Sequence, residues 1–400
     1  MRVKKSLLII STVLAATTVY AEPAKHMIIA PECLLKTAAI AYQPLATKNG
    51  LQLISADDAV VNQLAEAKHR AKQCGGFKDV TEDWQHQPAA RKLNAAAFMT
   101  DQTSVKSIKA PAYKIQYQKE TENTLKDINP QNMWNNLATL TSFDDRYANS
   151  ETGVKAAQWI KDKIETFAKE SGHDDVSVYF VKTGASYKQP SVVAKFGKGS
   201  GPGIVIGAHM DTLISSSAKK KPGADDDGSG TVTLMETART LLASGLKFDK
   251  PIYFVWYSAE ELGLIGSQFV VADFKKKNIP VAAALQLDMT GYENSKDPTI
   301  WLMTDEQDTN KNLTAYLREL IKTYVKVPTK NSQCGYACSD HASWQAAGIP
   351  AAFPFETRME EDDPYIHTSQ DTMEFLTLEH MTDFAKLATA YAVELAEPVK

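Results

Sequence analysis

The chain has 400 residues, of which 44% are hydrophobic and 23% are charged, and this is enough for one large globular domain or two ordinary ones. A formal net charge of −4 at pH 7 leaves no basic footprint, which argues against nucleic acid as a partner and against electrostatic adhesion to anionic membranes. Small substrates or proteins are the expected partners.

The first residues have the pattern of an export signal. The basic stretch MRVKK is followed by the apolar run SLLIISTVLAA, and Val19 and Ala21 stand where a signal peptidase reads small residues. The apolar run is shorter than the roughly 20 residues that span a bilayer, and no later segment approaches that length. We therefore predict a signal peptide over residues 1–21, an exported and soluble mature chain, and no stable membrane anchor.

Residues 22–110 differ from the rest of the chain. They are rich in alanine, contain helical patterns such as DDAVVNQLAEAKHRAKQ, form a loop around Cys74, and show no strong strand. The polar stretch 100–110 has little apolar periodicity, as is typical of an exposed linker where proteolysis concentrates. We expect a small propeptide or accessory segment here, followed by the main domain over residues 111–400.

From Asn129 onward, apolar strands alternate with amphipathic helices. The expected helices cover residues 129–143, 154–170, 230–244, 265–277, 313–325, 341–348 and a stretch from about 378, and the expected strands cover 177–181, 191–196, 203–209, 251–259, 281–289, 299–304 and 351–355. Strands this apolar, separated by helices, indicate a largely parallel sheet that is covered on both faces. The fold class predicted is α/β, a three-layer α/β/α sandwich with a mixed, mostly parallel central sheet.

In such sheets, ligands gather at the carboxyl ends of the strands. The stretch GAHMD places His209 at the end of strand 203–209 and Asp211 two residues later. A lone histidine at a strand end is usually an ordinary hydrogen-bonded residue at the edge of the sheet. The triplet 225–227, three aspartates, stands just before a helix. On its own the triplet fits a helix cap as well as a metal site, and the alternate spacing of an EF-hand is absent.

Three further stretches supply carboxylates or imidazole to the same edge. Glu260 and Glu261 follow strand 251–259, although paired glutamates are usually found simply on a solvent-exposed surface. Asp288 ends an apolar strand, where an unpaired buried carboxylate needs a cation or hydrogen bonds, and His367 lies in the late loop YIHTSQD. Taken together, imidazole nitrogen and carboxylate oxygen suit zinc, and a bridging carboxylate among five ligands suits a pair of metals.

The motifs GAHMD, GADDDGSG, AEELGLIGS, LQLDMT, CGYACSDHASW and IHTSQDT together closely resemble those of the secreted bacterial leucyl aminopeptidases, a family of co-catalytic di-zinc exopeptidases. The resemblance covers about residues 129–400, and the residues before about 110 lie outside it. It implies the zinc-exopeptidase fold, two Zn²⁺ ions as cofactors, and a secreted metallo-aminopeptidase that removes N-terminal residues from peptides.

The resemblance also implies a role for each position. The implied metal ligands are His209 and Asp288 for one zinc, His367 and Glu261 for the other, and Asp226 as the bridge. Glu260 would be the general base that takes the proton of a metal-activated water and returns it to the departing amine. Asp211 would orient His209 from behind, as carboxylates commonly do for metal-bound imidazoles.

The expected substrate contacts are apolar. Met289, Phe355 and Ile366 flank ligands and offer a wall for a leucine-like side chain, although they also suit an ordinary core, and Tyr336 would help to hold the tetrahedral oxygen. The acidic run 360–363 precedes the last ligand and would favour lysine or arginine instead if it faced the pocket.

The chain has four cysteines, Cys33, Cys74, Cys334 and Cys338, which suit disulfides in an oxidising compartment. Proximity in sequence favours the pairs Cys33–Cys74 and Cys334–Cys338. The second pair could instead be half of a zinc site, but no further close pair of cysteine and histidine completes one.

Other functions remain as alternatives: a carboxypeptidase or glutaminyl cyclase on the same scaffold, a non-catalytic binding module, or a calcium-stabilised structural protein. The expected partners are peptide or protein N-termini and a processing protease, and we expect a monomer. An exported exopeptidase has reason to be latent, so we expect residues 22–110 to cover the metal cleft until they are removed. The alternative is a permanent accessory domain.

Overall fold

The computed structural model describes residues 26–88, 94–104, 112–199, 201–214, 220–294 and 299–399. The expected signal peptide over residues 1–21 and most of the expected linker lie outside these ranges. In the described part of the chain, no helix combines the length and the apolar character that a bilayer crossing requires.

The main domain is built on a six-stranded sheet in the order β12-β9-β7-β8-β6-β5. Its strands are β5 (Val176–Val181), β6 (Ser191–Phe196), β7 (Gly203–His209), β8 (Ile252–Tyr257), β9 (Val281–Gln286) and β12 (Ala351–Ala352). The strands from β12 to β8 are parallel, and β6 runs antiparallel to both β8 and β5. The prediction of a mixed, mostly parallel sheet is confirmed.

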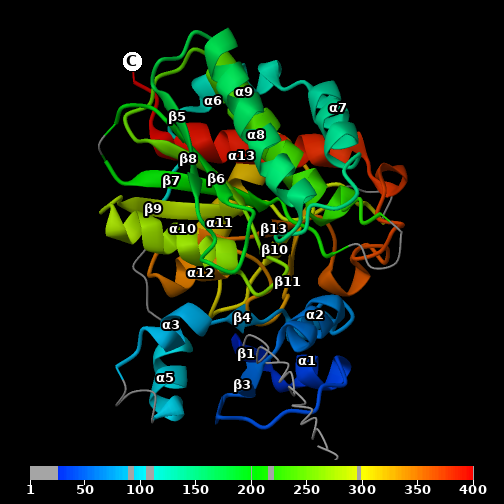
Figure 1. Ribbon diagram of the computed structural model, residues 1–400. Helices are drawn as coiled ribbons and strands as arrows, with labels where there is room; N and C mark the ends of the chain where they lie inside the picture. The colour runs from blue at the N-terminus through cyan, green and yellow to red at the C-terminus, as the bar shows by residue number, and fades with distance from the viewer. Residues whose placement is uncertain are drawn as a thin grey trace, which may run out of the picture.

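Helices cover both faces of this sheet (Figure 1). On one side lie α8 (Glu151–Glu170), α9 (Gly230–Ala243) and α13 (Leu378–Ala396), with α7 (Pro130–Leu140) packed on α9, and on the other side lie α10 (Ile265–Lys276) and α12 (His341–Ala346). Successive strand residues point to opposite faces, so Ile206 and Phe254 pack in one core cluster while Val205 and Val255 pack in the other. The three-layer sandwich is therefore confirmed.

A smaller three-stranded sheet extends the main domain. It has the order β11-β10-β13 and consists of β10 (Ile300–Met303), β11 (Thr329–Ser332) and β13 (Pro354–Phe355). The remaining elements are α6 (Gln118–Thr124), α11 (Lys311–Leu320), the short 3₁₀ helices η2 (Leu125–Asp127), η5 (Met359–Glu361) and η6 (Met373–Phe375), and the short π-helices η3 (Ala224–Ser229) and η4 (Ile321–Val325). The single strand expected over 351–355 is in fact divided, because β12 pairs with β9 whereas β13 pairs with β10.

The described residues 26–88 and 94–104 form an N-terminal domain. Its four-stranded antiparallel sheet, β2-β3-β1-β4, consists of β1 (His26–Pro31), β2 (Ala46–Lys48), β3 (Leu51–Ala56) and β4 (Lys78–Asp79), and its helical elements are α1 (Glu32–Thr37), α2 (Asp58–Ala67), η1 (Lys72–Cys74), α3 (Thr81–Gln85) and α5 (Ala95–Gln102). The expectation of no strong strand here is wrong. The apolar runs HMIIAP and LQLISA pair along their full length. They are too short to stand out as strands beside the stronger helical patterns of this segment.

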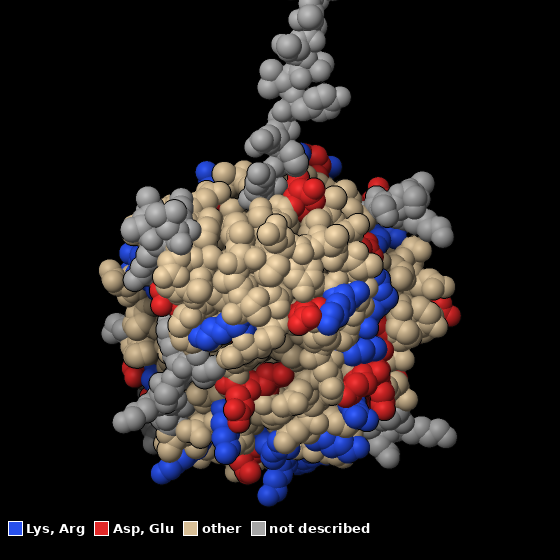
Figure 2. Space-filling model, turned by 90° about the horizontal axis from the view of Figure 1, so that it is seen from below, with Lys and Arg blue, Asp and Glu red and all other residues tan. Residues whose placement is uncertain are grey.

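The N-terminal domain packs directly on the main domain, below it in Figure 1. Met27 and Leu53 share one buried cluster with Leu264, Tyr336 and Ala342 of the main domain. The predicted Cys33–Cys74 disulfide is present and joins α1 to η1. Figure 2 shows the molecule from this side, where a broad uncharged area borders a region in which acidic and basic side chains are mixed.

Candidate metal centre

Four of the expected site residues stand at the ends of three adjacent parallel strands. His209 is the last residue of β7, Glu260 and Glu261 follow β8, and Asp288 follows β9. Because the three strands are parallel neighbours, their carboxyl ends meet at one edge of the sheet. All four residues are buried, with exposed fractions between 0% and 6%. Their polar atoms therefore need partners inside the protein.

The remaining two ligands complete two connected groups of donors. Nε2 of His209 lies 3.0 Å from Oδ1 of Asp226 and 3.4 Å from Oδ1 of Asp288. Nε2 of His367 lies 3.0 Å from Oδ2 of Asp226 and 3.1 Å from Oε2 of Glu261. Asp226, in η3, thus presents one oxygen to each histidine. The structure brings all five expected ligands together, in the two groups that the sequence resemblance implies.

The donor atoms of this cluster face one another without forming hydrogen bonds. Nε2 of His209, Nε2 of His367, Oδ2 of Asp226 and Oε2 of Glu261 are buried and have no hydrogen-bond partner among the described residues. Ligands about 2.0–2.2 Å from a tetrahedral zinc are roughly 3.3–3.6 Å from one another, close to the observed separations. The donor set of imidazole nitrogen and carboxylate oxygen fits zinc.

The electrostatics of the cluster also favour added positive charge. Burial by itself lowers the pKa of His209, but Asp288 and the neighbouring carboxylates outweigh it and raise that pKa well above its usual range. In the same way, Glu261 and Asp226 overcome the effect of burial and raise the pKa of His367 to about 10. Burial raises the pKa of Asp226, but the two imidazoles of His209 and His367 lower it by more, so the pKa falls well below its usual range. The buried carboxylates thus attract cationic groups strongly.

Asp211 holds the turn that carries the two glutamates. Its carboxylate accepts hydrogen bonds from the backbone N–H of Glu260 at 3.0 Å and of Glu261 at 3.3 Å. Nδ1 of His209 lies 3.2 Å from the backbone oxygen of Asp211 and 3.6 Å from its carboxylate. Asp211 therefore contacts His209 from behind, as expected, and also fixes the glutamates, which the sequence did not indicate.

Two aspartates that sequence reasoning did not assign support the ligands. Asp227 accepts hydrogen bonds from the backbone N–H of His209 and of Met289, both at 3.0 Å. Asp371 accepts from the backbone N–H of Asp226 at 3.2 Å. Both belong to the motifs GADDDGSG and IHTSQDT, but neighbouring carboxylates look alike in sequence, so no pattern separated the ligand from its supports.

Three of the four expected substrate contacts gather on one side of the site. Met289, Phe355 and Ile366 belong to one buried apolar cluster, which also contains Phe353. Tyr336 does not join them. Its ring packs in the cluster shared with the N-terminal domain, and its hydroxyl has no hydrogen-bond partner among the described residues. The role of Tyr336 in holding the tetrahedral oxygen stays a prediction.

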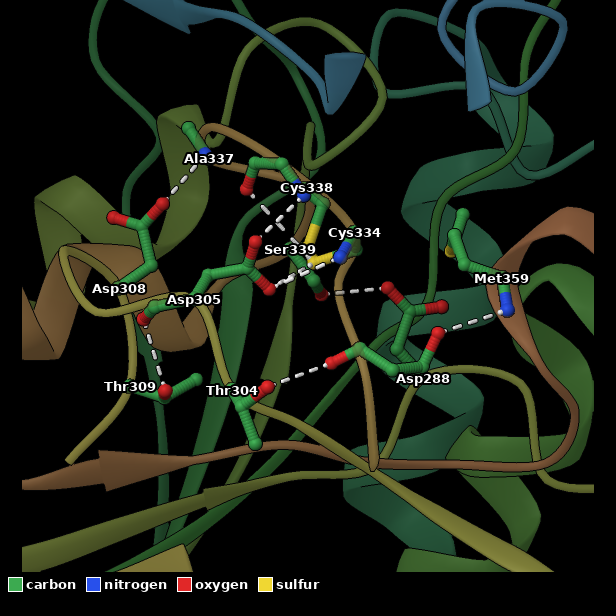
Figure 3. The surroundings of a disulfide bond; sticks show 12 residues. Asp288, Thr304, Asp305, Asp308, Thr309, Cys334, Ala337, Cys338, Ser339 and Met359 are labelled. Carbon is green, nitrogen blue, oxygen red and sulfur yellow. Dashed lines mark hydrogen bonds between the residues drawn. A yellow bond between two sulfur atoms is a disulfide. The ribbon is translucent and has the colours of Figure 1, made fainter. Parts of the chain in front are cut away.

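The loop that carries Tyr336 is closed by the predicted Cys334–Cys338 disulfide (Figure 3). Asp305 accepts hydrogen bonds from the backbone N–H of Cys334 at 3.0 Å, and Oγ of Ser339 donates to Oδ2 of Asp288 at 2.5 Å. The loop is therefore tied to one of the expected ligands. The alternative of a zinc site at these cysteines is wrong, because a disulfide leaves no thiolate to bind metal.

Two residues at the end of α2, Lys68 and His69, reach into the site from the N-terminal domain. Nζ of Lys68 lies 2.6 Å from Oε2 of Glu260 and 3.0 Å from Oε2 of Glu261. Burial by itself lowers the pKa of Lys68, but these two carboxylates raise it well above its usual range, so the ammonium stays charged. Sequence analysis missed both residues, because a Lys-His pair at the end of an ordinary amphipathic helix matches no motif.

Residues 191–392 match the model of Peptidase family M28. The chain belongs to peptidase family M28. It is 40% identical to leucine aminopeptidase 1 of Penicillium rubens over 280 residues, which are 67% of this chain and 72% of that protein. It is 37% identical to leucine aminopeptidase 1 of Fusarium vanettenii over 335 residues, or 79% of this chain and 84% of that protein. The predicted enzyme class, a metallo-aminopeptidase, is confirmed.

A solved structure extends the likeness to the N-terminal domain. The crystal structure of the LapA aminopeptidase of Legionella pneumophila has a TM-score of 0.87 and 43% identity, and covers 95% of this chain and 100% of that chain. LapB of the same organism has a TM-score of 0.85 and 41% identity, covering 94% of this chain and 100% of that chain. Coverage this high includes the N-terminal domain, although the sequence motifs had placed its residues outside the resemblance.

Proposed function

We propose that this M28 enzyme hydrolyses the N-terminal residue from peptides with two zinc ions, one held by His209 and Asp288, the other by His367 and Glu261, and both by Asp226. The observation that carries the proposal is the convergence of these five donors into two groups that share one bridging carboxylate. When bound, a zinc pair activates water and polarises the scissile carbonyl. The chain's own residues supply proton transfer and substrate binding.

Glu260 is the proposed general base. Its Oε2 lies 3.9 Å from Nε2 of His209, farther than Asp226 or Asp288 lies from that nitrogen, so we assign it to proton transfer after Lys68 has left, rather than to metal binding. Burial raises the pKa of Glu260 well above its usual range, although Lys68 and His209 pull it down. A carboxyl in such a site accepts the proton of the attacking water and returns it to the departing amine.

The position of Lys68 supports an exopeptidase. A primary ammonium already lies 2.6 Å from Glu260, and the N-terminus of a peptide is a primary ammonium of the same charge and hydrogen-bonding capacity. Asp288 stands on the same side, 3.4 Å from His209. The α-ammonium of the substrate takes the place of the Lys68 ammonium near Glu260 and Asp288, which restricts cleavage to the first peptide bond.

The proposed side-chain preference is leucine or another large apolar residue. Met289, Phe355 and Ile366 form an apolar wall beside the ligands, and burying a leucine side chain there is worth roughly 1.5–3 kcal/mol. The curated relatives are named leucine aminopeptidase 1. The acidic run favours the alternative of lysine, but its Asp362 pairs with Lys72 of the N-terminal domain. A clear preference for lysyl over leucyl substrates would show that this run lines the pocket of the processed enzyme.

The N-terminal domain is proposed to be a removable cover. Lys68 pairs with Glu260 where the substrate ammonium is proposed to bind, and Tyr336 packs in a buried cluster with residues of the N-terminal domain. We propose that the chain is exported through a signal peptide, and its two disulfides suit an oxidising compartment. A processing protease then removes the cover.

The test is metal analysis combined with product analysis of the processed enzyme. We expect two zinc ions per chain, release of the first residue from leucyl anilides and leucyl peptides, and no cleavage when the N-terminus is acetylated. Release of C-terminal residues, or cyclisation of N-terminal glutamine without hydrolysis, would assign the site to a carboxypeptidase or a glutaminyl cyclase. A single zinc in a fully active enzyme would contradict the two-metal site.

A further inference from the structure

The imidazole of His69 lies in the metal centre without a hydrogen bond. Its side chain is 17% exposed, yet both ring nitrogens are buried and have no hydrogen-bond partner among the described residues. Nε2 points to Oδ2 of Asp226 at 3.7 Å, and the ring meets the ring of His367 edge-on, with centroids 4.7 Å apart. Buried polar nitrogens nearly always have a hydrogen-bond partner, and an exception calls for another partner, such as a bound ion. A cation bound by Nε2 would supply that partner for His69.

His69 belongs to a set of donors that can share one cation. The ligand atoms of His69, Asp226 and His367 all lie within 4.8 Å of one another, and Oε2 of Glu261 lies 3.1 Å from Nε2 of His367. Zinc in a catalytic site has three protein ligands and an open position, whereas a structural zinc has four protein ligands and no open position. His367, Glu261 and Asp226 are the three ligands on this side, and His69 stands where a fourth would be.

We propose that His69 is a fourth protein ligand of the metal on the His367 side as long as the N-terminal domain remains attached. The bound ion is a divalent cation of the zinc type. Its binding by His69 fills the open coordination position, so the catalytic site becomes a closed one. This inference rests on the proposed zinc site and adds a ligand that only the unprocessed chain possesses. Removal of the N-terminal domain takes the imidazole away and opens the coordination position.

The side of the ring opposite the metal supports this assignment. Nδ1 of His69 faces Oδ2 of Asp362 at 3.6 Å. A metal-bound histidine commonly has a carboxylate or carbonyl behind its other nitrogen, which orients the ring. Asp362 is itself buried and held by Lys72, so it is fixed in place. His69 therefore has both a group of ligands in front of Nε2 and a carboxylate behind Nδ1.

The chain segment around His69 is held firmly enough to position a ligand. Before it, Glu66 forms an ion pair with Lys221 of the main domain at 3.2 Å. After it, the backbone N–H of Gly76 donates to the carbonyl of Tyr336 at 2.7 Å. Gly75 has a φ of +76° and approaches so closely that a Cβ would lie 2.3 Å from the same carbonyl oxygen. Contacts on both sides of His69 thus fix its position over the site.

Lys68 and His69 act on different parts of the centre. An ammonium has three donors and no lone pair, so Lys68 cannot bind a cation and pairs with Glu260 instead. The imidazole of His69 can bind a cation through Nε2. Loss of Lys68 therefore frees Glu260 and removes a contact to Glu261 without removing a metal donor, whereas loss of His69 removes a donor and leaves Lys68 on Glu260.

The test counts imidazole ligands in the unprocessed and processed proteins, both loaded with zinc alone. X-ray absorption at the zinc edge should show three imidazoles shared by two zinc ions in the unprocessed chain and two after processing. His69→Ala in the unprocessed chain should give two, whereas His86→Ala should leave three, because the side chain of His86 is exposed on the same domain. A chelator should withdraw one zinc at least about tenfold faster from His69→Ala than from the wild type, the order expected for losing a metal-supporting group.

An equal number of imidazoles before and after processing, with equal rates of zinc withdrawal, would overturn the proposal. This comparison uses only wild-type chains, so it decides the matter even if His69→Ala fails to fold. The proposed function fails separately, through a processed enzyme that lacks two zinc ions or releases no N-terminal residue. An unprocessed chain with two imidazoles and an active processed enzyme would reject His69 as a ligand and leave the aminopeptidase intact.

Discussion

The two adjacent glutamates in the turn after β8 have different surroundings and opposite pKa shifts. Oε2 of Glu261 lies 3.1 Å from Nε2 of His367. Burial and Asp226 raise the pKa of Glu261, but His367 and Lys68 lower it more, to about 2, so it remains ionised, as its proposed role as a ligand requires. Burial dominates for Glu260, whose pKa rises well above its usual range. The same residue type thus suits the proposed ligand at one position and the proposed proton carrier at the next.

Replacing Glu260 by glutamine should separate these roles. Glu260→Gln removes proton transfer and leaves all five donors, so we expect two zinc ions to remain while kcat falls by about 10²–10⁴-fold. Zinc content and kcat of the processed enzyme are the measurements. The matched control is Glu261→Gln, which should lose zinc. If Glu260→Gln lost zinc while Glu261→Gln kept both ions, the two roles would be reversed.

At the scale of single residues, the sequence identified the proposed ligands better than it identified their neighbours. His209, Asp226 and His367 stand in motifs that resemble those of the aminopeptidase family, so the resemblance implied that they converge, although only His209 stands at a strand end. Lys68 and His69 could not, because their role arises only from the docking of one domain on another, and no local pattern records docking. Tyr336 shows the same limit, because its packing in a cluster with the N-terminal domain arises from docking and leaves no local pattern.

At the scale of elements, strands with strong apolar character were predicted well and polar or divided strands were not. Strand β11 has the sequence TKNS and is mostly accessible, so its pairing with β10 left no hydrophobic pattern to detect. The stretch 351–355 read as one strand because its residues are uniformly apolar, and only tertiary pairing divides it. Pairing partners, rather than propensity, decide such elements.

The Cys334–Cys338 loop is expected to contribute more to positioning than to stability. A loop this short loses little entropy on closure, so the double variant Cys334→Ala/Cys338→Ala should lose less than about 3 kcal/mol of unfolding free energy. Because Ser339, the residue directly after this loop, donates to Asp288, we expect weaker zinc binding on the His209 side. Denaturant unfolding and zinc titration of the processed enzyme measure the two effects. A large loss of stability with unchanged zinc affinity would assign the disulfide a purely structural role.

His26 should make the stability of the N-terminal domain depend on pH. Its Nδ1 lies 2.6 Å from Asp79 and its Nε2 lies 2.8 Å from Asp58, at the start of α2. The hydrogen bond to Asp79 is the main cause that raises the pKa of His26 to about 9, although burial opposes it. The folded-state pKa is thus above the unfolded value of 6.5. The stabilisation is complete below about pH 6.5 and is lost as the pH rises through 9.

The expected loss between pH 6.5 and 9 is about 1–2 kcal/mol, since Asp58 is solvent-exposed and screening reduces its part. Thermal unfolding of the unprocessed chain across this pH range measures it. His26→Gln should flatten the dependence, and the exposed His86→Gln should not. An equal pH dependence in the wild type and His26→Gln would place the effect on another group.

At the scale of the whole molecule, the two domains are complementary in charge at the metal centre. The main domain contributes the buried carboxylates of the cluster and of the acidic run. The N-terminal domain places Lys68, His69 and Lys72 beside these carboxylates. The apolar cluster around Tyr336 surrounds this contact on one side. A domain with these charge and apolar contacts stays docked while the linker is intact, and in the proposed function cutting the linker allows it to leave.

We therefore expect the unprocessed protein to be weakly active and to gain activity on trimming. Lys68 holds the general base, and the loss of general-base catalysis alone is worth about 10²–10⁴-fold, so activity should rise by about 10²-fold or more when a protease moves the N-terminus to residues 100–115. Leucyl anilide hydrolysis followed during limited proteolysis, with mass spectrometry of the new N-terminus, measures both events. The Lys68→Met variant, left uncut, should stay weakly active because the rest of the domain still covers the cleft. Full activity of the uncut wild type would reject latency, and the N-terminal domain would then be a permanent accessory domain of the enzyme.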